Sequence, residues 1–240
     1  MKLLFISLGC DKNLVDSEEM LGMLAADGHE IVDDEDEAEV IIVNTCCFIG
    51  DAKEESVNTI LEMAEKKKAG TCKVLIVTGC MAQRYKKEIS EEIPEVDAIL
   101  GTTSYGDISK AVKEAQAGRH FEEYKSIDFL PDISGKRMLT TGGHFAYLKI
   151  AEGCDKHCTY CIIPKIRGNF RSVPMERLLK EAQDLAEQGV KELILVAQET
   201  TLYGKDLYGE KSLPKLLREL CKISGIRWIR ILYCYPEEIT

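Results

Sequence analysis

The sequence predicts an α/β protein in which a doubly wound parallel sheet is followed by the first part of a barrel of βα units. Two observations lead to this prediction. Short apolar runs alternate with helical segments along residues 1–118, as in parallel sheets with crossover helices. The alternation resumes at residue 144, after a segment with Pro131, Gly135 and two further glycines but no sustained periodicity. We therefore expect domains at residues 1–118 and 144–240, joined by a linker at 119–143.

The first domain is expected to contain four strands and four helices. The run VIIV at residues 40–43 is continuously apolar, as expected for a strand buried on both faces of a parallel sheet. Asp16, with Glu19 three residues later, resembles a capping box at the start of the first helix. The expected strands cover residues 3–8, 40–43, 74–77 and 96–100, and the expected helices cover residues 16–28, 51–68, 82–92 and 104–117.

The second domain repeats the pattern in a form typical of barrels. Its expected strands cover residues 145–150, 193–196 and 228–233, and its expected helices cover residues 174–188 and 213–223. Three strands are too few for a complete barrel, which takes about 250 residues. We therefore expect the sequence to be an amino-terminal fragment of a longer protein.

Composition and charge exclude several classes of protein. The start of the chain lacks the layout of a signal peptide, and no apolar run is long enough to span a membrane, so we expect a cytoplasmic protein without a membrane partner. In that compartment ten cysteines indicate metal binding rather than disulfides. The net charge of −10 disfavours non-specific nucleic-acid binding and suits a basic protein partner.

Cys154, Cys158 and Cys161 follow an expected strand in the spacing CxxxCxxC. Soft thiolates select zinc, copper(I) or an iron–sulfur cluster. A structural zinc site needs four ligands, and His157 is awkward as the fourth because it is adjacent to Cys158. Three thiolates on a four-iron cluster would leave one iron open for a small molecule. The alternative is a zinc or disulfide module that matches this spacing by chance.

Three dispersed cysteines, Cys10, Cys46 and Cys80, each follow an expected strand of the first domain. Parallel α/β sheets build their ligand crevice beyond the carboxyl ends of their strands, so these thiols are expected to converge on one site. The alternative is three buried structural cysteines. The other four cysteines are assigned to packing: Cys47, Cys72, Cys221 and Cys234. Cys47 could also replace Cys46 as a ligand, because the two are adjacent.

The two cysteine sets together resemble those of the radical S-adenosylmethionine (SAM) methylthiotransferase family, along the whole chain. The runs SLGCDKNLVDSE at residues 7–18, NTCCFI at 44–49 and CIIPKIRG at 161–168 resemble its RimO branch, except that Cys47 stands where glycine is expected. That branch modifies an aspartate of ribosomal protein S-twelve of the small subunit. The MiaB branch, which modifies tRNA, typically opens with a different run of the GCQMN type.

The resemblance implies two 4Fe–4S clusters and SAM as cofactors. Cys154, Cys158 and Cys161 would hold the SAM-binding cluster, and the three dispersed cysteines would hold an auxiliary cluster that carries the sulfur. The SAM-derived radical would then allow a methylthio group to be added to the aspartate β-carbon, chemistry that belongs to the cofactors rather than to side chains. The residues implied to contact SAM are Tyr160, Gln198 and Arg171.

The resemblance also implies partners, namely the ribosomal protein as substrate and flavodoxin or ferredoxin as electron donor. Arg167 and Arg171 would bind a carboxylate of SAM or of the substrate, whereas their alternative role is a surface salt bridge. For Gln198 the alternative is an ordinary polar loop residue. A tRNA methylthiotransferase and a non-catalytic iron–sulfur or zinc protein are the alternative functions, and the fragment alone is expected to show little turnover.

Overall fold

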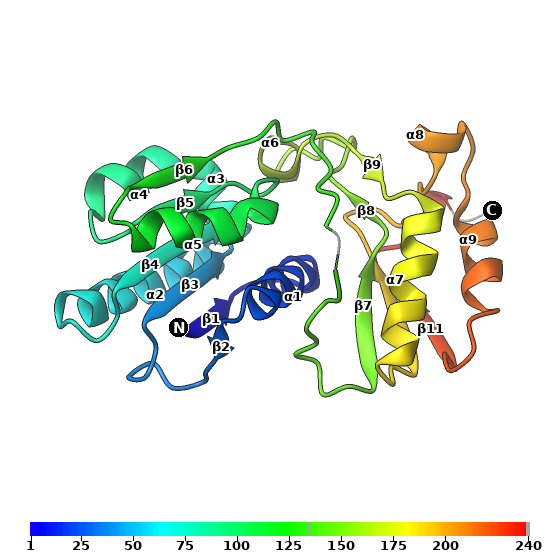
Figure 1. Cartoon of the computed structure of the whole chain (residues 1–240). Coiled ribbons are helices and arrows are strands. Elements are labelled where there is room, and N and C mark those ends of the chain that lie inside the picture. Colours follow the sequence, from blue (N-terminus) through cyan, green and yellow to red (C-terminus); the bar gives the residue numbers. More distant parts are fainter. Residues whose placement is uncertain (134, 239–240) are drawn as a thin grey trace. The chain divides into compact units, whose positions relative to one another are not determined.

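The computed structural model describes residues 1–133 and 135–238, which form two compact units, Met1–Met138 and Leu139–Thr240. Each unit has its own parallel sheet (Figure 1). Residue 134, inside the predicted linker, and residues 239–240, at the end of the predicted second domain, lie outside the described residues. The predicted linker at 119–143 stays a prediction.

A six-stranded parallel sheet forms the first unit, in the order β2-β1-β3-β4-β5-β6. The chain moves outward from β1 to β2 and then returns to β3 on the other side of β1. The strand order therefore reverses between β1 and β3, where sheets of this type open a ligand crevice. The strands are β1 (Lys2–Ser7), β2 (Glu30–Ile31), β3 (Val40–Thr45), β4 (Val74–Gly79), β5 (Ala98–Leu100) and β6 (Phe121–Glu123).

Helices cover both faces of this sheet (Figure 1). On one face, α1 (Asp11–Ala26) and α5 (Ile108–Gln116) contribute Leu24 and Val112 to a core that contains Ile42 of β3. On β3 the neighbours of Ile42 point to the opposite face and are also buried. There α2 (Gly50–Lys68) and α3 (Cys80–Arg84) contact β3 and β4, and α4 (Lys86–Glu92) packs next to α3.

The doubly wound sheet confirms the predicted fold class, with differences in individual elements. The two-residue β2 and three-residue β6 were not predicted. The first helix begins at Asp11 rather than at Asp16, because Cys10 takes the extended conformation of the helix N-cap and Asp16 is buried within the helix. The predicted helix at 82–92 is two helices, because Tyr85 leaves helical geometry (φ −119°, ψ 33°).

A buried ion pair fixes the end of the first unit to α1. Arg137 Nη2 lies 3.0 Å from Glu18 Oε2, with side-chain exposures of 4% and 0%. The Met138 N–H donates to the Glu18 carbonyl oxygen at 3.1 Å. Because a buried charge is tolerated only when it is paired, this contact holds residues 137–138 on the helix that begins beside Cys10.

The second unit contains the parallel sheet β11-β10-β7, which confirms the three predicted barrel strands. The strands are β7 (Phe145–Lys149), β10 (Glu192–Val196) and β11 (Trp228–Ile231), and the predicted helices are α7 (Met175–Glu187) and α9 (Leu213–Leu220). The buried Leu178, Leu185 and Leu216 belong to the apolar stripes of the two helices. Elements that were not predicted are the antiparallel pair β8 (Ala151–Glu152) and β9 (Arg171–Ser172), and the short helices α6 (Ile163–Arg167) and α8 (Lys205–Tyr208).

None of the helices in residues 1–133 and 135–238 combines the length and the apolar character needed to cross a membrane.

Candidate metal centres

The three dispersed cysteines lie at the carboxyl ends of three neighbouring strands, as predicted from their sequence positions. Cys10 follows β1 and is the N-cap residue of α1. Cys46 directly follows β3, and Cys80 follows β4 as the first residue of α3. Thr45 pairs with Gly79 in the sheet register, so Cys46 and Cys80 follow paired positions. Figure 1 shows β1, β3 and β4 ending at the same edge of this sheet.

Gly9 brings the loop that carries Cys10 directly onto Cys46. Its φ is +92°, and a Cβ built on Gly9 would lie 2.6 Å from Cys46 Cβ and 2.9 Å from Cys46 Sγ. A side chain is therefore excluded both by backbone conformation and by space. The close approach of these two loops is built into the sequence as the Gly-Cys pair.

We expect Gly9→Ala to destabilise the first unit by about 1–3 kcal/mol more than Gly28→Ala, because only the first substitution overpacks a neighbour. Gly28 is a matched control, since its φ of +84° is similar and a Cβ added there would meet no atom within 4 Å. Urea unfolding of both variants would measure the difference. Equal losses in the two variants would show that backbone strain alone matters at Gly9.

Buried hydroxyl groups fix the backbone of the Cys46 and Cys80 loops. Ser56 Oγ accepts a hydrogen bond from the Cys46 N–H (3.0 Å) and donates to the Cys46 carbonyl oxygen (2.8 Å). Thr45 Oγ1 donates to the Thr78 carbonyl oxygen (2.6 Å) and accepts from the Met81 N–H (3.2 Å). These bonds satisfy backbone groups that leave the sheet at the strand ends, and so they hold the two loops in defined positions.

The CxxxCxxC loop connects β8 to α6 in the second unit. The Cys154 N–H donates to the Gly168 carbonyl oxygen at 3.1 Å, and the Cys161 N–H donates to the Cys158 carbonyl oxygen at 2.9 Å. Gly153 has a φ of +76°, and a Cβ there would clash with the Asn169 carbonyl oxygen. The start of the loop is therefore pressed against residues 168–169.

The pKa of Cys154 responds to its burial and to the other two thiols of this loop. Burial raises the pKa of the Cys154 thiol, and a hydrogen bond from the Lys156 N–H opposes that effect. The Cys161 and Cys158 thiols raise the pKa of Cys154 further. Neighbouring thiols oppose each other's ionisation, and a cationic cluster would relieve this because coordinated thiols are deprotonated. The donor set therefore fits a metal cluster.

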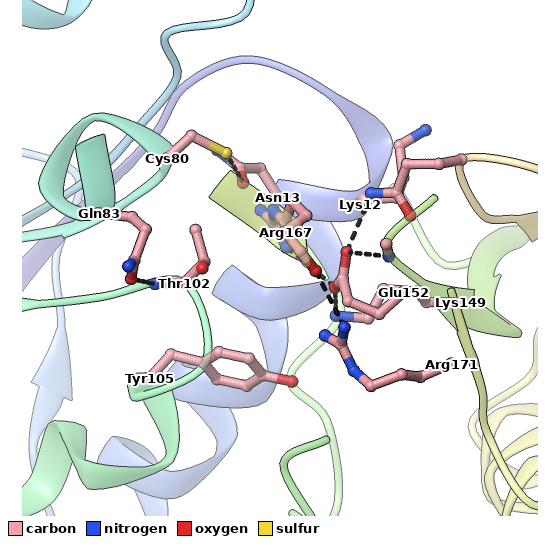
Figure 2. Close-up of polar contacts among 12 residues, drawn as sticks. Lys12, Asn13, Cys80, Gln83, Thr102, Tyr105, Lys149, Glu152, Arg167 and Arg171 are labelled. Atoms are coloured by element: carbon pink, nitrogen blue, oxygen red, sulfur yellow. Dashed lines mark hydrogen bonds and ion pairs between the residues drawn. The ribbon is translucent and has the colours of Figure 1, made fainter. Parts of the chain in front are cut away.

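A buried carboxylate, Glu152, lies immediately before this loop and was not predicted as part of the site. Figure 2 shows Glu152 beside the cationic side chains of Lys149 and Arg167. Burial alone would raise the pKa of Glu152, but the charges of Arg167 and Lys149 and a hydrogen bond from Gln198 outweigh it and hold the pKa well below the usual carboxyl range. Its donors are Gln198 Nε2 (2.9 Å), Arg167 Nη1 (3.0 Å), Lys149 Nζ (3.2 Å) and the Gly153 N–H (3.3 Å).

Two of the residues expected to contact SAM differ in their surroundings. Tyr160 is 84% exposed, next to Cys161 in the loop. Gln198 lies beyond the end of β10, where its Nε2 donates to Glu152. Its Oε1 is buried and accepts no hydrogen bond from any side chain or backbone group of the described residues. The Gln198 side chain is therefore held by a hydrogen bond to Glu152 rather than being only solvated.

The two arginines of the CIIPKIRG region are not exposed surface residues. Arg167 is buried and pairs with Glu152, so it does not form the surface salt bridge considered as its alternative role. Arg171 Nη1 donates to the carbonyl oxygens of Arg167 (3.1 Å) and Asn169 (2.6 Å). Arg171 therefore stabilises the segment 167–169, against which Gly153 packs.

The four cysteines assigned to packing divide into two groups. Cys47 and Cys72 are buried, as are Cys46 and Cys80, and their assignment to packing stays a prediction. The assignment is wrong for Cys221, which is exposed, because it caps the carboxyl end of α9 instead of facing the core. Cys234 is only half-buried, because β11 ends at Ile231, before it. All ten cysteines are free thiols.

No group of three His, Cys, Asp or Glu side chains within residues 1–133 and 135–238 is arranged to hold a single metal ion. An iron–sulfur cluster is a larger body than one ion, because each thiolate binds a different iron. The relevant features for a cluster are therefore thiols on loops that are held side by side. In the first set, Gly9 packs against Cys46 and Thr45 pairs with Gly79, so the three loops meet at one edge of the sheet, whereas the second set lies within the single loop that connects β8 to α6.

Residues 2–101 match the uncharacterized protein family UPF0004, and residues 148–237 match the radical SAM superfamily. Three curated relatives are each named ribosomal protein uS12 methylthiotransferase RimO. The one from Lachnoclostridium phytofermentans is 67% identical over 100% of this chain and 54% of its own length. Those from Clostridioides difficile and Acetivibrio thermocellus are 53% and 55% identical, over 100% and 98% of this chain and 54% and 53% of their own lengths. The chain thus spans about half the length of the curated relatives it matches.

Solved structures of radical SAM enzymes share the fold at low sequence identity. The apo form of the cobalamin-dependent enzyme OxsB is 12% identical with a TM-score of 0.60, over 96% of this chain and 38% of its own. The methyltransferase TsrM from Kitasatospora setae, with tryptophan and a SAM analogue bound, is 13% identical with a TM-score of 0.54, over 91% of this chain and 50% of its own. These likenesses concern the fold alone and agree with the predicted fold class.

Proposed function

Because this chain belongs to the radical SAM methylthiotransferase family, we propose that it forms part of an enzyme that transfers a methylthio group to the β-carbon of an aspartate in ribosomal protein uS12. The observation that carries the proposal is the pair of cysteine sets. One set lies on loops that follow parallel strands of the first unit, and the other lies on the loop that follows β7 and β8 in the second unit. The names of the relatives favour this substrate over tRNA. The net charge of −10 also suits a basic ribosomal protein.

Cys154, Cys158 and Cys161 would hold a 4Fe–4S cluster that leaves one iron open for SAM. When bound, the cluster and SAM supply a carbon radical that can remove hydrogen from an unactivated carbon. The protein binds and orients SAM around this chemistry. The buried Gln198 Oε1 would accept a hydrogen bond from the ammonium group of SAM, the guanidinium of Arg171 would bind its carboxylate, and Tyr160 would offer an aromatic face.

Cys10, Cys46 and Cys80 would hold the auxiliary 4Fe–4S cluster in a domain at residues 1–118, with 119–143 as the linker to the barrel. The close packing of Gly9 on Cys46 and the paired positions before Cys46 and Cys80 support this assignment. The auxiliary cluster supplies the sulfur, the electron donor is flavodoxin or ferredoxin, and the protein acts in the cytoplasm, where ribosomes are modified.

To test the proposed function, the chain would be joined at its carboxyl end to the matching remainder of the Lachnoclostridium phytofermentans relative and reconstituted with iron and sulfide. With SAM and a reductant, we expect mass spectrometry to find a methylthio group on one aspartate of uS12. Modification of tRNA adenosine without modification of uS12 would overturn the substrate. A hybrid that holds clusters but never cleaves SAM would instead indicate a non-catalytic iron–sulfur protein.

A further inference from the structure

One buried amide, Asn13, contacts the polypeptide at all three auxiliary cysteines. Asn13 Nδ2 donates to the Leu8 carbonyl oxygen, in the loop before Cys10, at 2.9 Å, and to the Thr45 carbonyl oxygen, next to Cys46, at 2.9 Å. Asn13 Oδ1 lies 3.9 Å from Cys80 Sγ (Figure 2). Since both carbonyls can only accept hydrogen bonds, the nitrogen must face them, which directs the oxygen to Cys80.

We propose that Asn13 is the positioning residue that sets the spacing of Cys10, Cys46 and Cys80 for an iron–sulfur cluster. The part of this inference that concerns the cluster rests on the proposed function. Asn13 is a neutral side chain with 0% exposure, so it adds no net charge beside the cysteines. The Cys80 thiol donates to Asn13 Oδ1, and when Cys80 is deprotonated as a ligand this contact is one of packing. The role of Asn13 follows from connecting three loops that are far apart in sequence.

Other polar side chains near the cysteines connect fewer loops. Ser56 bonds to the Cys46 backbone, and Thr45 joins its own loop to that of Cys80. A cluster with three protein ligands requires all three loops to be fixed relative to one another, because supporting hydrogen bonds hold metal ligands in their productive positions. Of these three side chains, Asn13 is the one whose contacts extend to every loop.

Asn13 is itself held rigidly in the first turn of α1. Its carbonyl oxygen accepts hydrogen bonds from Asn44 Nδ2 (3.0 Å) and from Ser17 Oγ (2.9 Å). Asn44 Nδ2 also lies 2.9 Å from Ser17 Oγ, which contacts Ser7 Oγ at 2.7 Å. Ser17 therefore supports the backbone of Asn13 but touches none of the cysteines in these contacts, which makes it a matched buried control.

The first test uses the reduced, cluster-free chain and measures alkylation of individual cysteines by iodoacetamide, with peptide mass spectrometry. We expect Asn13→Ala to speed alkylation of Cys46 and Cys80 about tenfold, since hydrogen bonds of ordinary strength change a local opening equilibrium by about that factor. We expect Ser17→Ala to stay within about twofold of the parent chain, because Asn44 Nδ2 still holds the Asn13 carbonyl oxygen and the lost bonds do not reach the cysteine loops. Equal effects of the two variants would overturn the inference.

The second test measures iron bound after anaerobic reconstitution, in a background with Cys154, Cys158 and Cys161 replaced by alanine. We expect Asn13→Ala and the isosteric Asn13→Asp to lose most auxiliary iron, whereas Ser17→Ala and the exposed control Asn58→Ala keep it. Asn13→Asp preserves side-chain volume, so it serves if Asn13→Ala fails to fold. Full iron in both Asn13 variants would overturn the inference. No iron in the parent background would contradict the proposed auxiliary cluster, while the alkylation test would still report on Asn13.

Discussion

Replacing Glu152 with glutamine is expected to lower the free energy of unfolding of the second unit by about 3–5 kcal/mol, the usual cost of removing one partner from a buried ion pair. The carboxylate balances the charges of two buried cations, Lys149 and Arg167. It also accepts hydrogen bonds from Gln198 Nε2 and the Gly153 N–H. Glutamine keeps the size and one acceptor oxygen but removes the charge. The two cations would then be left in the interior without this counter-ion.

The measurement for Glu152→Gln is urea unfolding followed by fluorescence of Trp228, which lies on β11 of the same unit. Glu192→Gln is the control, because Glu192 lies on β10 of the same unit and pairs with Arg230, but that arginine is largely exposed. An exposed pair contributes at most about 1 kcal/mol. A loss for Glu152→Gln no larger than that for Glu192→Gln would contradict the role assigned to the buried network.

Replacing Cys46 with alanine is expected to abolish the auxiliary cluster and with it all methylthio transfer by the hybrid enzyme, whereas Cys47→Ala retains both. The two residues are adjacent, buried and chemically identical, so the variants remove the same atoms from neighbouring positions. Cys46 packs against Gly9, and Ser56 forms hydrogen bonds with both the N–H and the carbonyl oxygen of Cys46. Iron content and uS12 modification would be measured on both variants. Loss in Cys47→Ala with retention in Cys46→Ala would show that the neighbouring thiol is the ligand.

The sheet and the position of three cysteines at its carboxyl edge could be predicted from the sequence, because both depend on local patterns. Continuous apolar runs mark buried parallel strands, and a residue directly after such a strand must lie at its carboxyl end. The start of α1 was misplaced because Asp16, which resembles a cap, is buried against the rest of the unit while Cys10 occupies the cap position.

The buried charge network could not be predicted, because it depends on which side chains meet in space. Lys149, Glu152 and Arg167 come from a strand end, a two-residue strand and a short helix. The available signal was a lysine and a glutamate placed among the apolar residues that lead into Gly153-Cys154. Charges in an otherwise buried strand end indicate pairing, but only the fold identifies the partners.

Anaerobic reconstitution followed by iron and sulfide analysis would show whether each cysteine set holds its own iron–sulfur cluster. The samples are the parent chain, a variant with Cys154, Cys158 and Cys161 replaced by alanine, and a variant with Cys10, Cys46 and Cys80 replaced. We predict two clusters in the parent and one in each variant. Zinc in place of iron, or loss of all iron in the first variant alone, would contradict this prediction.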